Sequence, residues 1–178
     1  MSLLRALFVL AIVGTAPRAA AQATSVVVLD LNRNSHADVV SPWDAKLAVT
    51  FDFDGSGLMQ RTGWVAAGDG MLVLDRNGNG RIDSGSELFA NYAALRAFDD
   101  NQDGVITAAD AVFTQLALWQ DLNHNGISEA RELKSLAQWD MTTITHSAAI
   151  AGENRYRLYR VDLTSRRTVV ARRSLTER

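Results

Sequence analysis

The chain is constrained most by a short acidic pattern that recurs at a nearly constant spacing. Five segments begin with aspartate, at Asp30, Asp52, Asp75, Asp99 and Asp121, so that successive starts lie 22, 23, 24 and 22 residues apart. Each segment then carries Asp, Asn or Ser at every second position, and four of the five reach glycine at the sixth position. A near-constant period of this length indicates one small structural unit that is used repeatedly.

The last two segments are complete twelve-residue loops of the EF-hand type, DDNQDGVITAAD and DLNHNGISEARE. Alternate side chains of such a loop converge on one point, where Ca²⁺ takes six to eight oxygens at about 2.3 to 2.6 Å. Glycine at position 6 permits the bend, position 7 offers its backbone carbonyl, and an acid at position 12 closes the site. The predicted calcium ligands are Asp99, Asn101, Asp103, Val105 and Asp110 in the first loop, and Asp121, Asn123, Asn125, Ile127 and Glu132 in the second.

The three upstream segments are less complete versions of the same loop. At Asp75 the closing acid, Glu87, falls one position late; at Asp52 the closing position is Gly63; at Asp30 both the glycine and the closing acid are missing. A metal-free interpretation also stays open, because Asp, Asn and Gly populate plain turns. The ligands predicted here are Asp75, Asn77, Asn79, Arg81 and Glu87, and Asp52, Asp54 and Ser56.

Hydrophobic patterning around the loops predicts an α+β fold, with central calcium loops that alternate with short helices and with strands and hairpins in the N- and C-terminal parts. Short apolar or alternating runs predict strands at Val26–Leu29, Leu47–Phe53 and Met71–Leu74. Apolar residues at helical spacing predict helices over Glu87–Phe98, Ala108–Gln120 and Ala130–Trp139. A further hairpin is predicted from Tyr156–Leu163 and Thr168–Ala171. We expect the tryptophans to pack in the core: Trp43, Trp64, Trp119 and Trp139.

The first residues have the pattern of an export signal. Arg5 precedes the apolar run Leu7–Val13, and Ala21-Gln22-Ala23 follows as an A-x-A cleavage pattern. The run is too short to span a bilayer, although an uncleaved anchor is the alternative. We therefore divide the chain into a signal peptide over residues 1–23, a calcium-binding module over 24–146 and a β-hairpin extension that packs on it over 147–178. We expect no membrane span in the mature chain and a secreted or periplasmic location.

Composition narrows the classes of partner. The formal net charge is −2, which gives no basic surplus for binding nucleic acid. Export would permit disulfides, yet the chain has no cysteine, so bound metal is the expected staple of the fold. The basic residues after residue 152 are all arginine. We interpret them as a solvated strand face, with contact to an acidic partner as the alternative.

The ordered loops, together with the run TGWVAAGDG, resemble the calcium-binding module of repeats-in-toxin (RTX) proteins of Gram-negative bacteria, and are similar to their self-processing module. The resemblance covers about residues 26–144. It implies a calcium-dependent fold and, in some members, cleavage of their own chain at an Asp-Pro bond before the first loop, which leaves an aspartyl carbonyl that can join to a lysine amine. Aligned on Asp30, that pair falls at Ser25-Val26, where no aspartate side chain can attack.

We therefore expect an exported, non-enzymatic calcium-binding protein that acts as a binding or structural module toward an unknown protein or cell-surface partner. Asn at positions 3 and 5 lowers the ligand charge, which suggests a Kd of ~10⁻⁵ to 10⁻³ M. A divergent self-processing or transpeptidating enzyme and a calcium-responsive regulator that acts through the Arg-rich tail are the alternatives. The sequence has no cysteine nucleophile, G-x-S-x-G or H-E-x-x-H motif. We interpret the three histidines as non-catalytic: His36, His124 and His146.

Overall fold

The computed structural model describes residues 25–145 and 158–163, which are organised around a five-stranded antiparallel sheet of order β11-β1-β6-β8-β9. Its strands are β1 (Ser25–Leu29), β6 (Gly70–Leu74), β8 (Leu116–Trp119), β9 (Leu133–Ser135) and β11 (Leu158–Asp162). Three two-stranded sheets pair β2 (Val39–Val40) with β5 (Trp64–Val65), β3 (Val49–Phe51) with β4 (Gln60–Thr62), and β7 (Val105–Ile106) with β10 (Ile144–Thr145). The short 3₁₀-helices are η1 (Gly85–Glu87), η2 (Tyr92–Phe98) and η3 (Ala137–Trp139).

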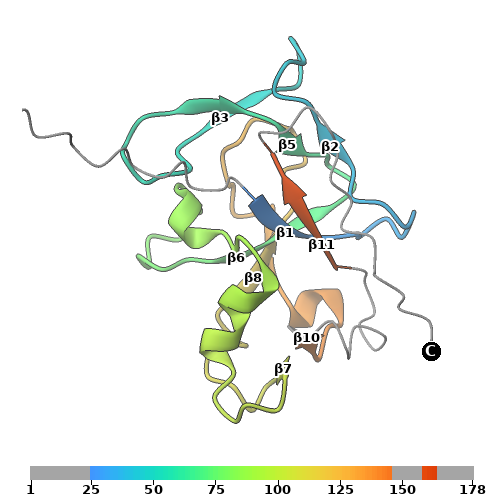
Figure 1. Ribbon diagram of the computed structural model, residues 1–178, viewed down its shortest axis with the longest axis vertical. Helices are drawn as coiled ribbons and strands as arrows, with labels where there is room; N and C mark the ends of the chain where they lie inside the picture. Colours follow the sequence, from blue (N-terminus) through green and yellow to red (C-terminus); the bar gives the residue numbers. More distant parts are fainter. Residues whose placement is uncertain (1–24, 146–157, 164–178) are drawn as a thin grey trace, which may run out of the picture.

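The central sheet is covered on both faces, so its strands alternate between two cores rather than between core and solvent. In β1, Val26 and Val28 lie in one core, and Val27 and Leu29 lie in the other. The first, which we call the hairpin-side core, also holds Phe51, Phe53, Trp64, Val65 and Trp119. The second, the helix-side core, holds Phe89, Leu95, Ile106, Leu136 and Ile144. Figure 1 shows β2, β3 and β5 at one end of the molecule and η2 and β7 at the other, with β1, β6 and β8 between them.

The α+β prediction is wrong, because the described residues are mainly β and contain no α-helix. Ala108–Gln120 forms turns followed by β8, Ala130–Trp139 forms β9 and η3, and only the second half of Glu87–Phe98 is helical, as the 3₁₀-helix η2. A strand buried on both faces carries apolar residues at every position. Residues three or four apart, such as Leu116 and Trp119, then match helical spacing by default.

The strand predictions fared better. β1 and β6 lie over the predicted runs Val26–Leu29 and Met71–Leu74, and β3 lies within Leu47–Phe53. β11 lies within Tyr156–Leu163 and pairs with the whole of β1, whereas Thr168–Ala171 and His146 fall outside the described residues. Trp64 and Trp119 are buried in the core as predicted. Trp43 is 69% exposed, so the core prediction is wrong for that residue.

The described ranges contain no helix of the length and apolarity that a bilayer crossing requires. The 3₁₀-helices that are present are three to seven residues long.

The junction between η1 and the residues after β3 leaves no room for a side chain at Gly85. The Gly85 N–H donates to the Asp52 carbonyl at 2.8 Å, and a Cβ at Gly85 would meet the Phe53 carbonyl group, with the carbonyl carbon at 2.7 Å and the Cα at 2.8 Å. Since these atoms belong to the backbone, they cannot move aside cheaply. We expect Gly85→Ala to lower the free energy of unfolding by about 3 kcal/mol, measured by urea denaturation.

The matched control is Gly55→Ala, where nothing lies within 4 Å and only the positive φ of 68° opposes a side chain. That change should cost about 1 kcal/mol. Equal losses in the two variants would contradict the steric argument.

Candidate metal centres

The five aspartate segments share one backbone conformation, including the segment at Asp30 that matches the pattern least. Each has positive φ at its fourth and sixth residues. The fourth residues are Arg33, Gly55, Gly78, Gln102 and His124, and the sixth residues are Ser35, Gly57, Gly80, Gly104 and Gly126. Ser35 adopts φ 70° although a residue with a Cβ resists this region. The repeat is therefore a repeat of structure, because even the position without glycine keeps the bend.

The first aspartate of every loop is held by the same two backbone donors. Its Oδ1 accepts the N–H of position 5 at 3.0 to 3.2 Å, and its Oδ2 accepts the N–H of position 6 at 2.7 to 2.9 Å. In the loop at Asp99 the Asn101 Oδ1 also accepts the Asp103 N–H at 3.1 Å, and the Asp103 Oδ1 accepts the Val105 N–H at 3.0 Å. The oxygens of positions 1, 3 and 5 are thus drawn to the inner side of the turn.

In the loops at Asp75, Asp99 and Asp121, the closing acid that the sequence predicts connects the two ends of the loop. One carboxylate oxygen accepts the N–H of position 2 and the other accepts the N–H of position 9. These acids are buried. Asp110 bonds Asp100 and Thr107 at 2.8 Å each, Glu132 bonds Leu122 at 3.0 Å and Glu129 at 3.3 Å, and Glu87 bonds Arg76 at 3.2 Å and Asp83 at 2.9 Å. Glu87 takes this place despite lying one position late in the sequence.

The loop at Asp30 has a closing acid that the sequence pattern did not reveal. Asp69, which is 1% exposed, accepts the Leu31 N–H at 3.2 Å and the Asp38 N–H at 2.7 Å through its two oxygens. Leu31 and Asp38 are positions 2 and 9 of that loop, so Asp69 does what Asp110 and Glu132 do in theirs. Asp69 lies 38 residues after Leu31, in the GDG end of the run TGWVAAGDG. A search confined to position 12 could not find it.

The loop at Asp52 is the exception, because no described acid closes it. Gln60 occupies position 9 and donates its Nε2 to the Asp54 Oδ2 at 3.1 Å. Asp52 and Ser56 keep the shared arrangement, with the Ser56 N–H donating to the Asp52 Oδ1 at 3.1 Å. This loop therefore lacks the closing carboxylate that an EF-hand-type site uses as a ligand.

The position 7 residues were predicted to offer backbone carbonyls rather than side chains. Val105 begins β7, and the side chain of Ile127 is exposed like that of Arg81. Each N–H donates to the position 5 side chain of its loop at 2.8 to 3.0 Å.

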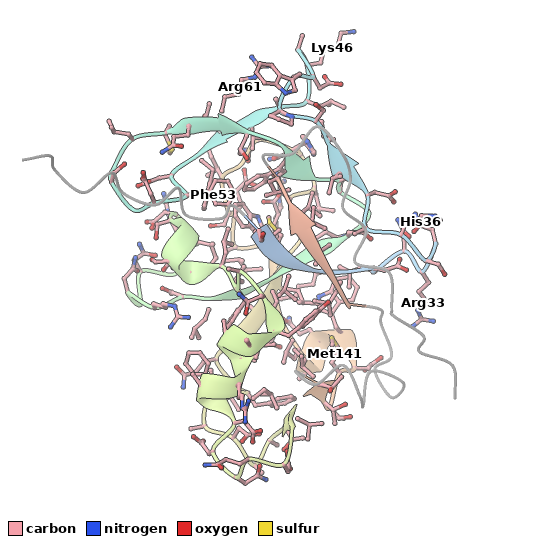
Figure 2. The ribbon with its side chains drawn as sticks, viewed as in Figure 1. Arg33, His36, Lys46, Phe53, Arg61 and Met141 are labelled. Atoms are coloured by element: carbon pink, nitrogen blue, oxygen red, sulfur yellow. The ribbon has the colours of Figure 1, made fainter. Side chains whose placement is uncertain are left out.

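Figure 2 shows Arg33 and His36 together on the loop after β1, away from the sheet, where both are exposed.

Two of the loops are joined side by side at their eighth residues. The Ile82 N–H donates to the Ser128 Oγ at 2.7 Å, and that hydroxyl donates back to the Ile82 carbonyl at 3.2 Å. This buried reciprocal pair connects the loops at Asp75 and Asp121. In the loop at Asp99 the eighth residue, Ile106, pairs instead with Ile144 of β10.

The closing acids have no cationic side chain beside them among the described residues. Burial raises the pKa of Asp69 to about 6, and the nearby carboxylates of Asp38 and Asp30 add to the shift. Burial likewise raises the pKa of Glu132, with Glu129 beside it as a second cause. Within residues 25–145 and 158–163, none of Asp69, Glu87, Asp110 and Glu132 forms an ion pair. A buried carboxylate without a cationic partner is costly, so a bound cation would relieve this cost.

The donor chemistry fits a hard cation, although no rigid cage exists beforehand. In the described ranges, no three His, Asp or Glu side chains lie close enough together to form a ligand set. The three predicted acidic ligands of the loop at Asp99 are likewise too far apart. The loops instead combine carboxylate, amide, hydroxyl and backbone carbonyl oxygens. Each carboxylate oxygen that accepts one N–H keeps a second lone pair. All-oxygen sets of this kind suit Ca²⁺ or Mg²⁺ rather than Zn²⁺ or copper.

Two comparisons place this arrangement among known proteins. The SPM domain model matches residues 27–170, which is more than half of the chain. The chain therefore belongs to the SPM domain family.

A stretch of 101 residues is also 48% identical to the iron-regulated protein FrpA of Neisseria meningitidis serogroup C. The matched stretch covers 49% of this chain but only 9% of that protein. Both similarities fit the repeats-in-toxin family that the loops resemble.

The role of Asp69 can be tested by replacing it with asparagine. One of the N–H groups of Leu31 and Asp38 would then face an amide NH₂ instead of an oxygen, which leaves a buried donor unpaired. We expect Asp69→Asn to lower the free energy of unfolding by roughly 2 to 3 kcal/mol in the presence of calcium, measured by urea denaturation.

Asp44→Asn is the control, because the half-buried Asp44 also accepts two backbone N–H groups, from Lys46 at 2.8 Å and Leu47 at 2.9 Å, but both bonds go to its Oδ1, so an asparagine oxygen can keep them. Its loss should stay near 0.5 kcal/mol. If Asp69→Asn were no more costly than Asp44→Asn, the closing role of Asp69 would be excluded.

Proposed function

We propose that this chain is an exported calcium-binding module, whose fold is stabilised by ions in the loops at Asp30, Asp75, Asp99 and Asp121, and that it acts as a non-enzymatic binding or structural protein. One observation carries the proposal: four buried carboxylates occupy equivalent places, each bonded to positions 2 and 9 of its loop. The loop at Asp52 would be a weaker fifth site. The ligands would come from positions 1, 3, 5 and 7 and from the closing acids.

Energetics support a stabilising role for the ion. A ligand that binds only the folded chain stabilises it by RT ln(1 + [L]/Kd), which is about 2.7 kcal/mol per site at 100 times Kd. The unfolded chain does not hold the closing acid near its loop, least of all at Asp30, where the acid is distant in sequence. Because Asn replaces Asp at several ligand positions, we expect Kd values of ~10⁻⁵ to 10⁻³ M.

Titration with calcium tests this proposal directly. Isothermal calorimetry should detect binding of at least two ions per chain, with a parallel gain of β-type circular dichroism and a rise in melting temperature, because the ion favours the folded state. Magnesium serves as the control, since its demand for near-ideal octahedral geometry should give weaker binding. No heat and no change in the melting curve at millimolar calcium would refute the proposal.

The non-enzymatic part of the proposal rests on the position aligned with the scissile bond. Ser25 and Val26 lie in β1, are buried, and pair with Asp162 and Val161 of β11. Ser25 supplies a hydroxyl where the cleavage chemistry requires a carboxylate. The resemblance to the self-processing module of repeats-in-toxin proteins makes self-processing the alternative function, and that alternative would require another aspartate to act as the nucleophile.

Mass spectrometry separates the two functions. The chain should keep its intact mass after incubation with millimolar calcium, with neither a fragment nor a cross-linked species, because the aligned bond lacks its nucleophile. A sample held in chelator gives the baseline. A fragment that forms only with calcium would establish the self-processing alternative, and its mass would locate the bond.

A further inference from the structure

The loop at Asp121 has a contact to the core that its own sequence does not predict. The indole N–H of Trp64 in β5 donates to the Asp121 Oδ2 at 2.7 Å, across 57 residues of chain. Trp64 is fully buried and Asp121 is 3% exposed. In the loops at Asp30, Asp52 and Asp75, by contrast, the described hydrogen bonds to the first carboxylate all come from the loop itself.

The indole decides which oxygen of Asp121 remains open. Oδ2 accepts both the Trp64 indole N–H and the Gly126 N–H, the latter at 2.8 Å, so both of its lone pairs are used. Among the described residues, only the Asn125 N–H donates to Oδ1, at 3.1 Å, which leaves this oxygen one lone pair. Rotation of the carboxylate would break the short bond to the indole. Oδ1 is therefore the oxygen available to an ion.

The indole is itself held by the hairpin-side core. Its ring lies 5.3 Å from the rings of both Phe51 and Trp119 and 6.3 Å from that of Phe53. The loop also packs on β3, because a Cβ at Gly126 would lie 3.1 Å from the Thr50 carbonyl oxygen. The indole therefore cannot swing away from Asp121 without disturbing this aromatic cluster. A movement of the Asp121 carboxylate would therefore also require a movement of the hairpin-side core.

We infer that Trp64 is a positioning residue for the cation site at Asp121: its indole N–H directs the Asp121 Oδ1 toward the ion and couples occupancy of this loop to the hairpin-side core. The inference rests on the proposed calcium function. It assigns Trp64 a second role besides filling the core. Burial alone would not give a tryptophan that role.

A neighbouring tryptophan provides a matched control. Trp119 is also fully buried in this aromatic cluster, but its Nε1 has no hydrogen-bond partner among the described residues. Trp64→Phe and Trp119→Phe remove similar volumes from the same core, and only the first removes the bond to Asp121. The difference between the two variants therefore isolates the bond from the packing.

The test is a calcium titration of the full chain followed by amide NMR, with two glycines as separate reporters. The Gly126 N–H bonds the Asp121 carboxylate and the Gly104 N–H bonds that of Asp99 at 2.9 Å, so each resonance follows its own loop. We expect Trp64→Phe to raise the calcium midpoint of Gly126 at least about tenfold, as is common when a group that orients a metal ligand is removed. The Gly104 midpoint should stay within about twofold, and Trp119→Phe should shift neither midpoint by more than that.

Other results have distinct meanings. Equal shifts of Gly126 in the two variants, or equal shifts of Gly126 and Gly104 in Trp64→Phe, would overturn the positioning role, since loss of packing alone would explain them. If no glycine of the unmodified chain responded to calcium, the calcium proposal would fail and the inference with it.

A second readout needs no change in the core. The indole N–H resonance of Trp64 in the unmodified chain should titrate with the midpoint of Gly126, while that of Trp119 should not move with it. A Trp64 resonance that ignored the Gly126 transition would overturn the inference even if Trp64→Phe did not fold.

Discussion

The structure depends on a buried carboxylate that accepts one backbone N–H from each end of a twelve-residue loop. The bond fixes where the chain enters and leaves the turn, so it also fixes the direction of the strands on either side. Carboxylates are suited to this because two oxygens reach two amides at once, and charged acceptors form stronger bonds than neutral ones. The same burial places these acids where no described cationic side chain forms an ion pair with them. A divalent ion at the centre of the loop, as proposed above, would resolve that conflict, and the stability of the fold would then depend on the ion as well as on these bonds.

The central sheet and the loops support each other. The loop at Asp30 follows β1 and the loop at Asp75 follows β6, while the loop at Asp121 begins just after β8. Sheet strands this short need cover on both faces, and the two cores supply it. The loops then hold the ends of the strands and, through Ile82 and Ser128, each other. In a chain without cysteine, these hydrogen bonds provide cross-links between distant segments, and unlike disulfides they are reversible.

Much of the local structure could be predicted from the sequence, because an Asp-x-Asn-x-Asn-Gly run determines its own turn through hydrogen bonds a few residues apart. The strands at Val26–Leu29 and Met71–Leu74 were also legible as short apolar runs. The strand within Ala108–Gln120 could not be predicted in this way, because a strand that is buried on both faces shows no alternation of apolar and polar residues. Asp69 and Trp64 were missed for a different reason. Each acts on a loop distant in sequence, and no local pattern records which loop that is.

The distant closing acid of the first loop has a consequence for the order in which the molecule is assembled. Asp110 lies 10 residues after Asp100, whereas Asp69 lies 38 after Leu31. The loop at Asp99 is complete as soon as its own twelve residues exist. The loop at Asp30 is complete only after β2, β3, β4 and β5 have been made and have returned the chain to its side. For a polypeptide that emerges N-terminus first, the loop at Asp30 therefore cannot close when its own twelve residues appear, and its completion marks the arrival of the surrounding tertiary structure.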